Sequence, residues 1–193
     1  MSDYEHEFGE LALVIGDFHI PYRAISIPES FKDLLVPNKV QNVICTGNIG
    51  SRETLDWLKS LSSSNYIVRG DYDDLPNVPD FRTFNIGTFK VGLTHGHQQI
   101  PWGDEIALSL LIREHDLDLL IGGHTHEARV SKIDGKYYIN PGSATGAYGA
   151  GGGDGEPSFL LLEFRENGVV VYVYKEVEGE VKIDKTVLSK PGK

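Results

Sequence analysis

The chain has 193 residues, of which 40% are hydrophobic and 10% aromatic, a composition typical of one globular domain with a sizeable core. Its 28 acidic and 18 basic residues give a formal net charge of −10, which argues against a broad surface for nucleic acid or anionic lipid and fits solubility or a basic partner. The apolar runs are far shorter than the ~20 residues that span a bilayer, and the polar, acidic start lacks the pattern of a secretory signal, so we expect a cytosolic protein.

Apolar, β-branched runs bounded by Gly, Pro, Asn or Asp predict strands in the first two thirds of the chain. In chain order these runs cover residues 11–15, 40–45, 66–68, 89–93 and 118–121. Helical spacing lies between them, over residues 29–35 after Pro28, 52–61 with Ser51 as N-cap, and 105–115 with Asp104 as N-cap. Strand and helix therefore alternate. The single cysteine, Cys45, ends a buried strand, which indicates an inert thiol in a reducing compartment.

From residue 127 the pattern changes to short strands joined by turn dipeptides. These are "DG" at 134–135, "NG" at 167–168 and "EGE" at 178–180, and they predict an antiparallel meander. The alternating run 169–177 suits a half-exposed strand, and the continuous run 159–164 suits a buried one. The simplest architecture is an α/β sandwich of two mixed β-sheets flanked by α-helices.

A single domain over residues 11–188 accounts for these elements. We expect residues 1–10 to form a disordered extension and residues 189–193 a tail. The stretch 146–157 contains too many glycines to hold a fixed shape alone, so we interpret it as a mobile loop inside the domain.

Five of the seven histidines come directly after apolar strands, namely His19, His95, His97, His124 and His126. Together with nearby carboxylates and amides they form the signatures "GDFH" (16–19), "TGN" (46–48), "RGD" (69–71), "THGH" (94–97) and "GGHTH" (122–126). Each has a glycine beside its polar residue, which lets the backbone approach a ligand without a Cβ clash. Because loops at the carboxyl ends of strands converge on one edge of an open α/β sheet, the signatures are expected to meet.

Imidazole nitrogens and carboxylate oxygens suit Zn, Mn or Fe, and two divalent ions about 3.5–4 Å apart form the usual clamp for displacement at phosphorus. A single HxH or DxH pair of residues in a loop is more often solvated or hydrogen-bonded than bound to a metal. Five signatures in one chain favour the metal interpretation. For His97 two roles remain open: it binds metal itself, or it orients a metal ligand or contacts bound phosphate.

The ordered series "GDFH", "GN", "GDYD", "HGH" and "GHTH" resembles the calcineurin-like metallophosphoesterase family, whose pattern is DxH, GDxxD, GNH, a later His and GHxH. The resemblance implies a metallophosphoesterase-like sandwich and up to two divalent metal sites, with Zn or Mn as the expected metals. It places Asp17, His19 and His126 on one metal and Asp71, His95 and His124 on the other, with Asn48 between them.

Two departures from the enzymatic pattern set this chain apart. The first is an exchange of residue types: Asn48 stands where the phosphoesterases have a bridging Asp, and Asp71 stands where they have the Asn of GNH. Because a neutral amide offsets repulsion between two dications less well than a carboxylate, we expect one metal site to be weaker or partly empty.

The second departure is Tyr72, which stands where the enzymes have a histidine that protonates the leaving group or stabilises the transition state. A phenol is a poor substitute near neutral pH, so efficient hydrolysis should be lost and no residue is assigned as catalytic. A wall residue of the pocket is the alternative role for Tyr72. Of its neighbours, Asp73 is expected to hold the shape of the loop and Asp74 to be solvated.

Longer strings, among them "HGHQQIPWGD" (95–104) and "YINPGSATGAY" (138–148), resemble the small subunits of this fold in the retromer complex, which recycles membrane cargo from endosomes. The likeness covers about residues 11–188. It implies a non-catalytic scaffold that is cytoplasmic, peripheral on endosomal membranes, and docked on the large helical-solenoid subunit of retromer. A weak or specialised metal-dependent phosphoesterase is the alternative, since most ligand positions match the enzymes.

Ile100, Pro101 and Trp102 form the first candidate surface for a partner, directly after the loop of residues 95–97 and before a helix. Exposed apolar residues anchor interfaces well, and the resemblance seats this edge in the concave end of the solenoid subunit. Packing of Trp102 beneath the helix N-terminus is the alternative.

Tyr172 and Tyr174 share one side of a late strand, with Leu161 nearby on the neighbouring strand. The resemblance implies that a hydrophobic patch in this region recruits regulators of small GTPases. Ordinary cross-strand packing of the tyrosines is the alternative.

Overall fold

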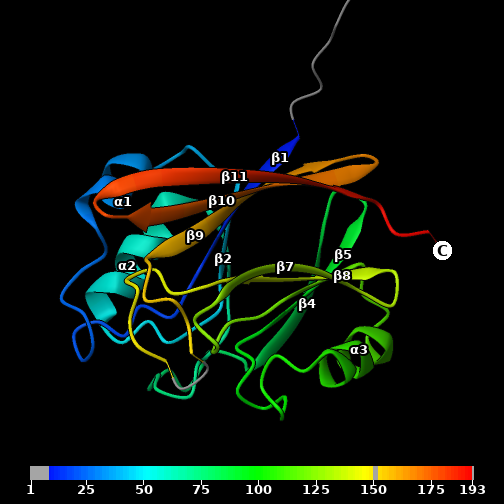
Figure 1. Ribbon diagram of the computed structural model, residues 1–193, viewed down its shortest axis with the longest axis horizontal. Coiled ribbons are helices and arrows are strands. Elements are labelled where there is room, and N and C mark those ends of the chain that lie inside the picture. Colours follow the sequence, from blue (N-terminus) through cyan, green and yellow to red (C-terminus); the bar gives the residue numbers. More distant parts are fainter. Residues whose placement is uncertain (1–8, 150–151, 193) are drawn as a thin grey trace, which may run out of the picture.

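The structure is a computed structural model that describes residues 9–149 and 152–192. Residues 1–8 of the expected extension, 150–151 of the glycine-rich loop and 193 of the tail lie outside the described residues. Two β-sheets pack face to face, and helices cover their outer faces (Figure 1). The predicted α/β sandwich of two mixed sheets flanked by helices is confirmed.

The first sheet has six strands in the order β11-β10-β9-β1-β2-β3. Their bounds are Glu10–Ile15 (β1), Asn42–Cys45 (β2), Ser64–Ile67 (β3), Ser158–Arg165 (β9), Gly168–Val177 (β10) and Glu180–Ser189 (β11). β1, β2 and β3 run parallel, whereas β9, β10 and β11 are antiparallel neighbours. Helices α1 (Glu29–Leu34) and α2 (Arg52–Leu61) lie against its outer face.

The second sheet has five strands in the order β4-β5-β6-β8-β7. Their bounds are Phe81–Ile86 (β4), Phe89–Thr94 (β5), Leu119–Ile121 (β6), Ala128–Ile133 (β7) and Lys136–Pro141 (β8), and helix α3 (Glu105–Glu114) packs on the outer face. The sequence did not predict β4. Its apolar residues, Phe81, Phe84 and Ile86, do not alternate strictly with polar ones, because β4 is an edge strand that buries only Ile86 fully.

The prediction of one antiparallel meander after residue 127 is wrong. β7 and β8 form a hairpin in the second sheet, where β8 also pairs in parallel with β6. The meander of β9, β10 and β11 belongs to the first sheet. Turn dipeptides fix a hairpin locally, but they carry no information on the sheet that the hairpin joins.

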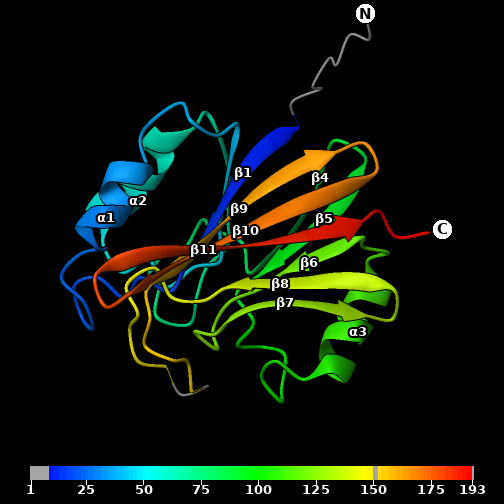
Figure 2. The ribbon, with the colours of Figure 1, turned by 45° about the horizontal axis from the view of Figure 1, so that its top comes forward.

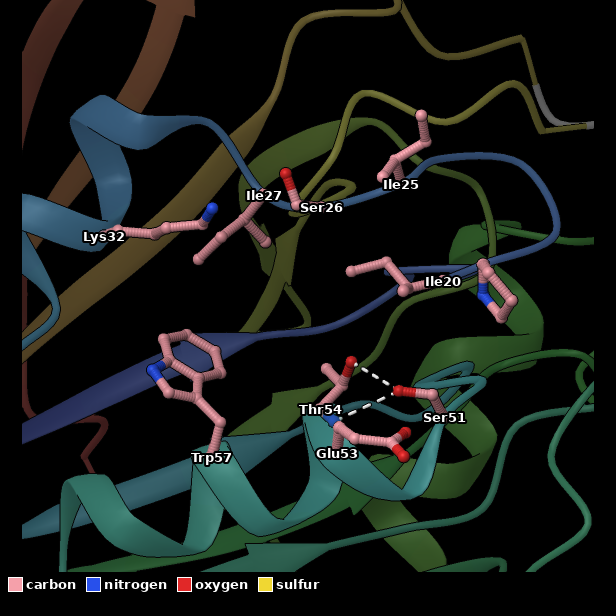
Figure 3. A pocket seen from close by; sticks show the side chains of 10 residues that line it. Ile20, Ile25, Ser26, Ile27, Lys32, Ser51, Glu53, Thr54 and Trp57 are labelled. Atoms are coloured by element: carbon pink, nitrogen blue, oxygen red, sulfur yellow. Dashed lines mark hydrogen bonds between the residues drawn. The ribbon is translucent and has the colours of Figure 1, made fainter.

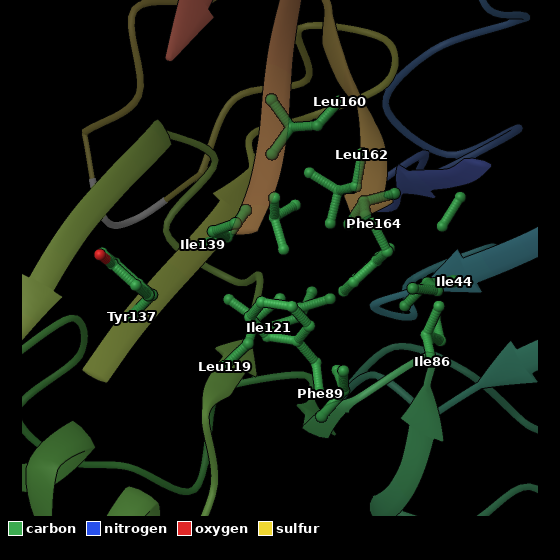
Figure 4. Close-up of a cluster of buried hydrophobic side chains, with 14 of the residues drawn as sticks. Ile44, Ile86, Phe89, Leu119, Ile121, Tyr137, Ile139, Leu160, Leu162 and Phe164 are labelled. Atoms are coloured by element: carbon green, nitrogen blue, oxygen red, sulfur yellow. The ribbon is translucent and has the colours of Figure 1, made fainter. Parts of the chain in front are cut away.

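Three layers of side chains make the core. The largest cluster fills the space between the two sheets (Figure 4), where the rings of Phe89 and Phe164 meet edge to face at a centroid distance of 5.7 Å. Phe31 of α1 and Leu58 of α2 are buried against the first sheet, and Leu108 of α3 is buried against the second. Each such side chain stabilises the fold by about 1.5–3 kcal/mol relative to exposure.

Both expected helix caps are present. The side chain of Ser51 accepts a hydrogen bond from the Thr54 backbone N–H, and that of Asp104 accepts from two backbone N–H groups of α3. Among the described residues no helix is long and apolar enough to cross a bilayer. The loops that follow β1, β2, β3, β5 and β6 gather at the lower edge of Figure 1, and the turned view in Figure 2 shows the same two-sheet arrangement.

Candidate metal centre

The polar signatures meet at the carboxyl-end edge of the parallel strands, where six side chains form two groups. Asp17, His19 and His126 make the first group, and Asp71, His95 and His124 make the second. Within each group the potential ligand atoms all lie within 4.8 Å of one another. These are the two sets that the family resemblance assigned to two metals, so the fold brings together residues from four separate loops.

Asn48 lies between the two groups. Its Nδ2 is 2.9 Å from Asp71 Oδ1 and 3.1 Å from His95 Nε2 in the second group. The same atom is 3.4 Å from both Asp17 Oδ1 and His19 Nε2 in the first group. Its Oδ1 accepts a hydrogen bond from the Tyr72 backbone N–H at 3.0 Å, so turning the oxygen toward the shared point would exchange this bond for contacts with two ions.

Five residues of the centre hold a left-handed backbone conformation, which is uncommon for residues with a side chain. They are Asp17, His19, Asn48, His124 and His126, with φ between 49° and 70°. Non-glycine residues with positive φ number nine in the described chain, so more than half of them are in this centre. Such strain concentrates where the surrounding structure holds side chains for a function.

Glycines make the close approach of these loops possible. A Cβ at Gly123 would lie only 2.7 Å from Asp17 Oδ2, and one at Gly70 would collide with the side chain of Asn48. This geometry bears out the interpretation that the glycines beside the polar residues allow the backbone to approach.

The histidine rings are oriented for metal ligation by backbone carbonyls. His95 Nδ1 lies 2.7 Å from the Thr46 carbonyl oxygen, and His126 Nδ1 lies 2.6 Å from that of Ala147. Each carbonyl therefore accepts the Nδ1 proton and turns Nε2 toward the centre. His19 Nε2 and His126 Nε2 face each other at 3.2 Å, and His124 Nδ1 lies 3.2 Å from His95 Nε2 in the second group. A divalent cation would bind these nitrogens in their deprotonated form, so the donor set fits a metal.

The charge states also fit a metal. Burial raises the pKa of Asp17, but the nearby imidazoles of His95 and His126 outweigh it and keep the pKa below its usual value. For Asp71 the opposing burial is likewise outweighed, by hydrogen bonds from His95 and Asn48, and the pKa is lowered. Burial lowers the pKa of His19 to about 4. At neutral pH both carboxylates are therefore ionised and His19 is neutral, which is the state that a cation requires.

Asp73 ties the Asn48 loop to its own loop. Its Oδ2 accepts hydrogen bonds from the backbone N–H groups of Asn48 at 2.7 Å and Gly70 at 3.0 Å. Its Oδ1 accepts from those of Ile49 at 2.8 Å and Gly50 at 3.2 Å. The role expected from the sequence, holding the loop's shape, is thus the role that its contacts describe, while Asp74 is exposed.

His97 and Tyr72 lie beside the ligand groups without joining them. The His97 ring centroid is 5.3 Å from that of His95, and its buried Nδ1 has no hydrogen-bond partner in the described chain. Tyr72 meets the His19 ring edge-on at 5.4 Å and carries the Arg23 guanidinium 4.6 Å above its own ring. Arg23 in turn donates to the Tyr148 carbonyl oxygen at 2.7 Å. These are the contacts of a wall residue, and Arg23 was not among the residues predicted from the sequence.

Trp102 lies against the second ligand group. Its Nε1–H donates to the His97 carbonyl oxygen at 3.2 Å, and its ring meets that of His124 edge-on at a centroid distance of 4.4 Å. Ile100 is 75% exposed, and Pro101 is exposed as well. The segment therefore places apolar surface beside the candidate metal centre, as the first interpretation expected.

A groove of about 460 Å³ opens next to the centre and was not anticipated (Figure 3). One wall is the loop after β1, with Ile20, Ile25 and Ile27, and the other is α2, with Trp57. Lys32 and Glu53 also line it. Its apolar residues belong to segments far apart in the sequence, so they look like ordinary core positions until the fold brings them together.

The late strands carry the second predicted surface. Leu161 of β9 is paired with Tyr172 of β10, and Tyr174 stacks on Phe159 at a centroid distance of 4.6 Å. Leu161 and Tyr174 also line a pocket of about 120 Å³. Leu34, the last residue of α1, lines the same pocket because α1 packs on this face. Cross-strand packing and an open apolar pocket therefore coexist here.

Two comparisons of sequence decide the family. Residues 11–167 match the calcineurin-like phosphoesterase superfamily domain. The vacuolar protein sorting-associated protein 29 (Vps29) of Schizosaccharomyces pombe is 40% identical over 185 residues, which are 94% of this chain and 99% of that protein. The chain belongs to the Vps29 family of this superfamily.

Solved Vps29 structures share the whole fold. Vps29 of Cryptosporidium parvum superposes with a TM-score of 0.91 at 41% identity, covering 95% of this chain and 100% of that one. Wild-type Vps29 of Entamoeba histolytica, in a complex with Zn²⁺, has a TM-score of 0.87 at 45% identity, covering 92% and 98%. The resemblance to retromer subunits of this fold is thereby confirmed. The Zn²⁺ complex of the Entamoeba relative, together with the two ligand groups, supports divalent-metal binding by this chain.

Proposed function

We propose that this chain is a non-catalytic scaffold subunit of retromer whose metal-bearing edge docks on the large helical-solenoid subunit. The observation that carries the proposal is the distribution of exposed apolar side chains. The described residues include eleven large apolar side chains that are exposed, and six of them lie in the loops that carry or flank the ligand groups: Tyr22, Ile25, Tyr72, Ile100, Trp102 and Tyr148. Apolar surface gathered around a polar centre marks a protein interface.

The lack of catalysis follows from what surrounds the ligand groups. Tyr72 fills the place of the enzymatic histidine, and its ring is occupied by Arg23 on one side and His19 on another. Losing a positioned acid or base costs ~10²–10⁴ in rate. Phosphoester hydrolysis should therefore stay slow even with metal bound.

Divalent ions, Zn²⁺ or Mn²⁺, would be held by the first and second ligand groups with Asn48 between them. When bound, they supply fixed positive charge. The ligands come from loops after four different strands, so bound metal ties these loops together and gives the docking edge a rigid shape. The chain itself would be cytoplasmic and peripheral on endosomal membranes, held there by the complex.

A second partner surface is supported by the pocket at Leu161 and Tyr174, with Tyr172 beside it. We assign it to regulators of small GTPases. This surface lies over the late strands and α1, away from the ligand groups, so a regulator and the solenoid subunit would bind independently.

Ile100→Asp tests the docking edge. The substitution puts a charge into the centre of the apolar contact and should weaken binding to the solenoid subunit about 100-fold in calorimetry. Val187→Asp is the matched control, because Val187 is 67% exposed on β11 and should bind as wild type. Equal binding of wild type and Ile100→Asp would overturn the docking proposal.

Hydrolysis assays separate the scaffold from the alternative phosphoesterase. Zn²⁺- or Mn²⁺-loaded protein should not turn over simple phosphomonoesters and phosphodiesters appreciably. Substantial hydrolysis that His95→Ala abolishes would favour the enzyme, since His95 is a fully buried member of the second group.

A further inference from the structure

β11 is an open edge strand. It is paired with β10 along all ten of its residues, and no other described strand lies on its outer side (Figures 1 and 2). Most of its side chains are exposed, with Ile183 at 54% and Val187 at 67%. It contains no proline, and its register with β10 is continuous. Natural sheets usually shield such an edge, because its free backbone groups accept another strand.

The hairpin turn fixes which backbone groups of β11 are free. Glu178 and Gly179 both have positive φ, which defines a two-residue type I′ turn closed by the hydrogen-bonded pair of Val177 and Glu180. Hydrogen-bonded pairs then alternate along the ladder, so Val181, Ile183, Lys185 and Val187 point their N–H and C=O groups outward. The bond from Lys190 N to the Asn167 carbonyl oxygen, at 2.9 Å, agrees with this alternation.

We propose that β11 pairs antiparallel with β11 of a second copy of this chain, about a two-fold axis at Ile183. In this register Ile183 faces its own copy, and Val181 faces Lys185 of the second copy in outward-pointing, hydrogen-bonded pairs. Lys182 then lies opposite Asp184 of the second copy, and the symmetry repeats this pair. Such non-hydrogen-bonded pairs bring side chains closest together.

Charge selects this register over its neighbours. Lys182 and Asp184 have no ion-pair partner within 4.0 Å in the described chain, so both are available to a second copy. An axis at Lys185 would place two lysines opposite each other. An axis at Val181 would place Lys182 opposite Glu180 but Asp184 opposite Glu178, and it would pair only residues 180–182 of the strand. An axis at Val187 would pair only residues 185–189 of the strand. The axis at Ile183 gives two opposite-charge pairs and about six backbone hydrogen bonds.

The symmetry also arranges the second partner surface. The axis is perpendicular to the sheet, so both copies present the same face to the same side. The two pockets at Leu161 and Tyr174 would therefore open side by side on one continuous sheet. A partner with two binding segments would gain affinity from such a pair of pockets.

Ile183→Cys tests the axis directly. Hydrogen-bonded antiparallel pairs have Cα atoms about 5.5 Å apart, which a disulfide spans. In a glutathione redox buffer Ile183→Cys should become mostly a disulfide dimer. Val187→Cys is the control: Val187 is more exposed than Ile183 but lies opposite the turn of the second copy, so the variant should stay mostly monomeric. The native Cys45 is buried and does not interfere. Equal dimer yields from the two variants, or none from Ile183→Cys, would overturn the proposal.

Charge exchange tests the register. Sedimentation of the wild type from about 10 μM to about 1 mM should show a mass rising from 21.4 kDa toward twice that value. Asp184→Lys should weaken the dimer about tenfold, and Lys182→Asp with Asp184→Lys should restore it. A wild type that is monomeric at every concentration, as expected if β11 accepts a strand from another protein instead, would refute self-association. Failure of the double variant to recover would refute the register.

Discussion

The two ligand groups differ in how far solvent reaches them. Asp17, His19 and His126 are all buried, with no more than 4% of any residue exposed. In the second group His95 is equally buried, but the Asp71 side chain is 28% exposed and that of His124 11%. His126 is enclosed by the glycine-rich loop, where a Cβ at Gly149 would lie 2.7 Å from its ring. An ion in the first group would exchange slowly, and the second group is where we expect the weaker, partly empty site.

The largest effect should come from removing one histidine from each group. His126 and His124 stand two residues apart on the same loop with similar left-handed backbones, so they form a matched pair. His126→Ala should lower affinity for the first, tightly held ion at least about 100-fold, more than the loss of a group that merely orients a ligand. His124→Ala should leave that ion in place and remove only the second. Zinc content after dialysis and calorimetric titration measure both.

The distinction between two separate metal sites is wrong if the two variants lose the same ion. Identical zinc content for His126→Ala and His124→Ala would mean that the groups bind as one site, with Asn48 at its centre. Wild-type protein that takes up no zinc at all would instead contradict metal binding altogether.

Asp73→Ala should cost about 2–3 kcal/mol of unfolding free energy, because four backbone N–H groups lose their acceptor. Asp73 supports the loop of Asn48, which both groups share, so both metals should bind less tightly. Asp74→Ala is the control, since Asp74 is exposed and its loss should change stability by less than about 0.5 kcal/mol. Urea denaturation of the metal-free variants gives the difference, and equal stabilities would remove Asp73 from its anchoring role.

Much of this centre was readable from the sequence because each ligand follows a strand directly. Asp17, His95 and His124 come after short apolar runs, and the topology of parallel strands carries their loops to one edge. Asp73 was readable only in part, since its bond to the Gly70 N–H is local, whereas the Asn48 loop that it also holds lies 23 to 25 residues away.

The features that were not predicted from the sequence depend on contacts between segments far apart in the chain. Arg23 reaches Tyr72 and Tyr148 only after three loops have folded together, and nothing local marks it. The groove at Ile20 and Trp57 likewise needs α2 placed against the loop after β1. The hairpin of β7 and β8 was expected as a hairpin but in the wrong sheet, because its partner β6 is chosen by burial across the sandwich.

Asn48→Asp should sharpen the contrast by strengthening the second site. A carboxylate at the shared point offsets the repulsion between two dications, so affinity for the second ion should rise about tenfold, with less effect on the first. Competition with a zinc chelator measures both affinities. Asn48→Ser, which keeps the site neutral, is the control, and an unchanged second affinity in Asn48→Asp would show that charge does not limit occupancy.

The smallest effect concerns protons in the enclosed group of the metal-free chain. Burial, partly opposed by Asp17 and reinforced by Arg23, lowers the pKa of His19 from 6.5 to about 4. Between these two values the unfolded chain binds a proton at His19 that the folded chain does not, so this residue alone makes the fold less stable as pH falls from about 6.5 to about 4. Long-range ¹⁵N–¹H spectra should show the His19 ring still neutral at pH 5, and a midpoint near the ordinary value would mean that solvent enters the first group as freely as the second.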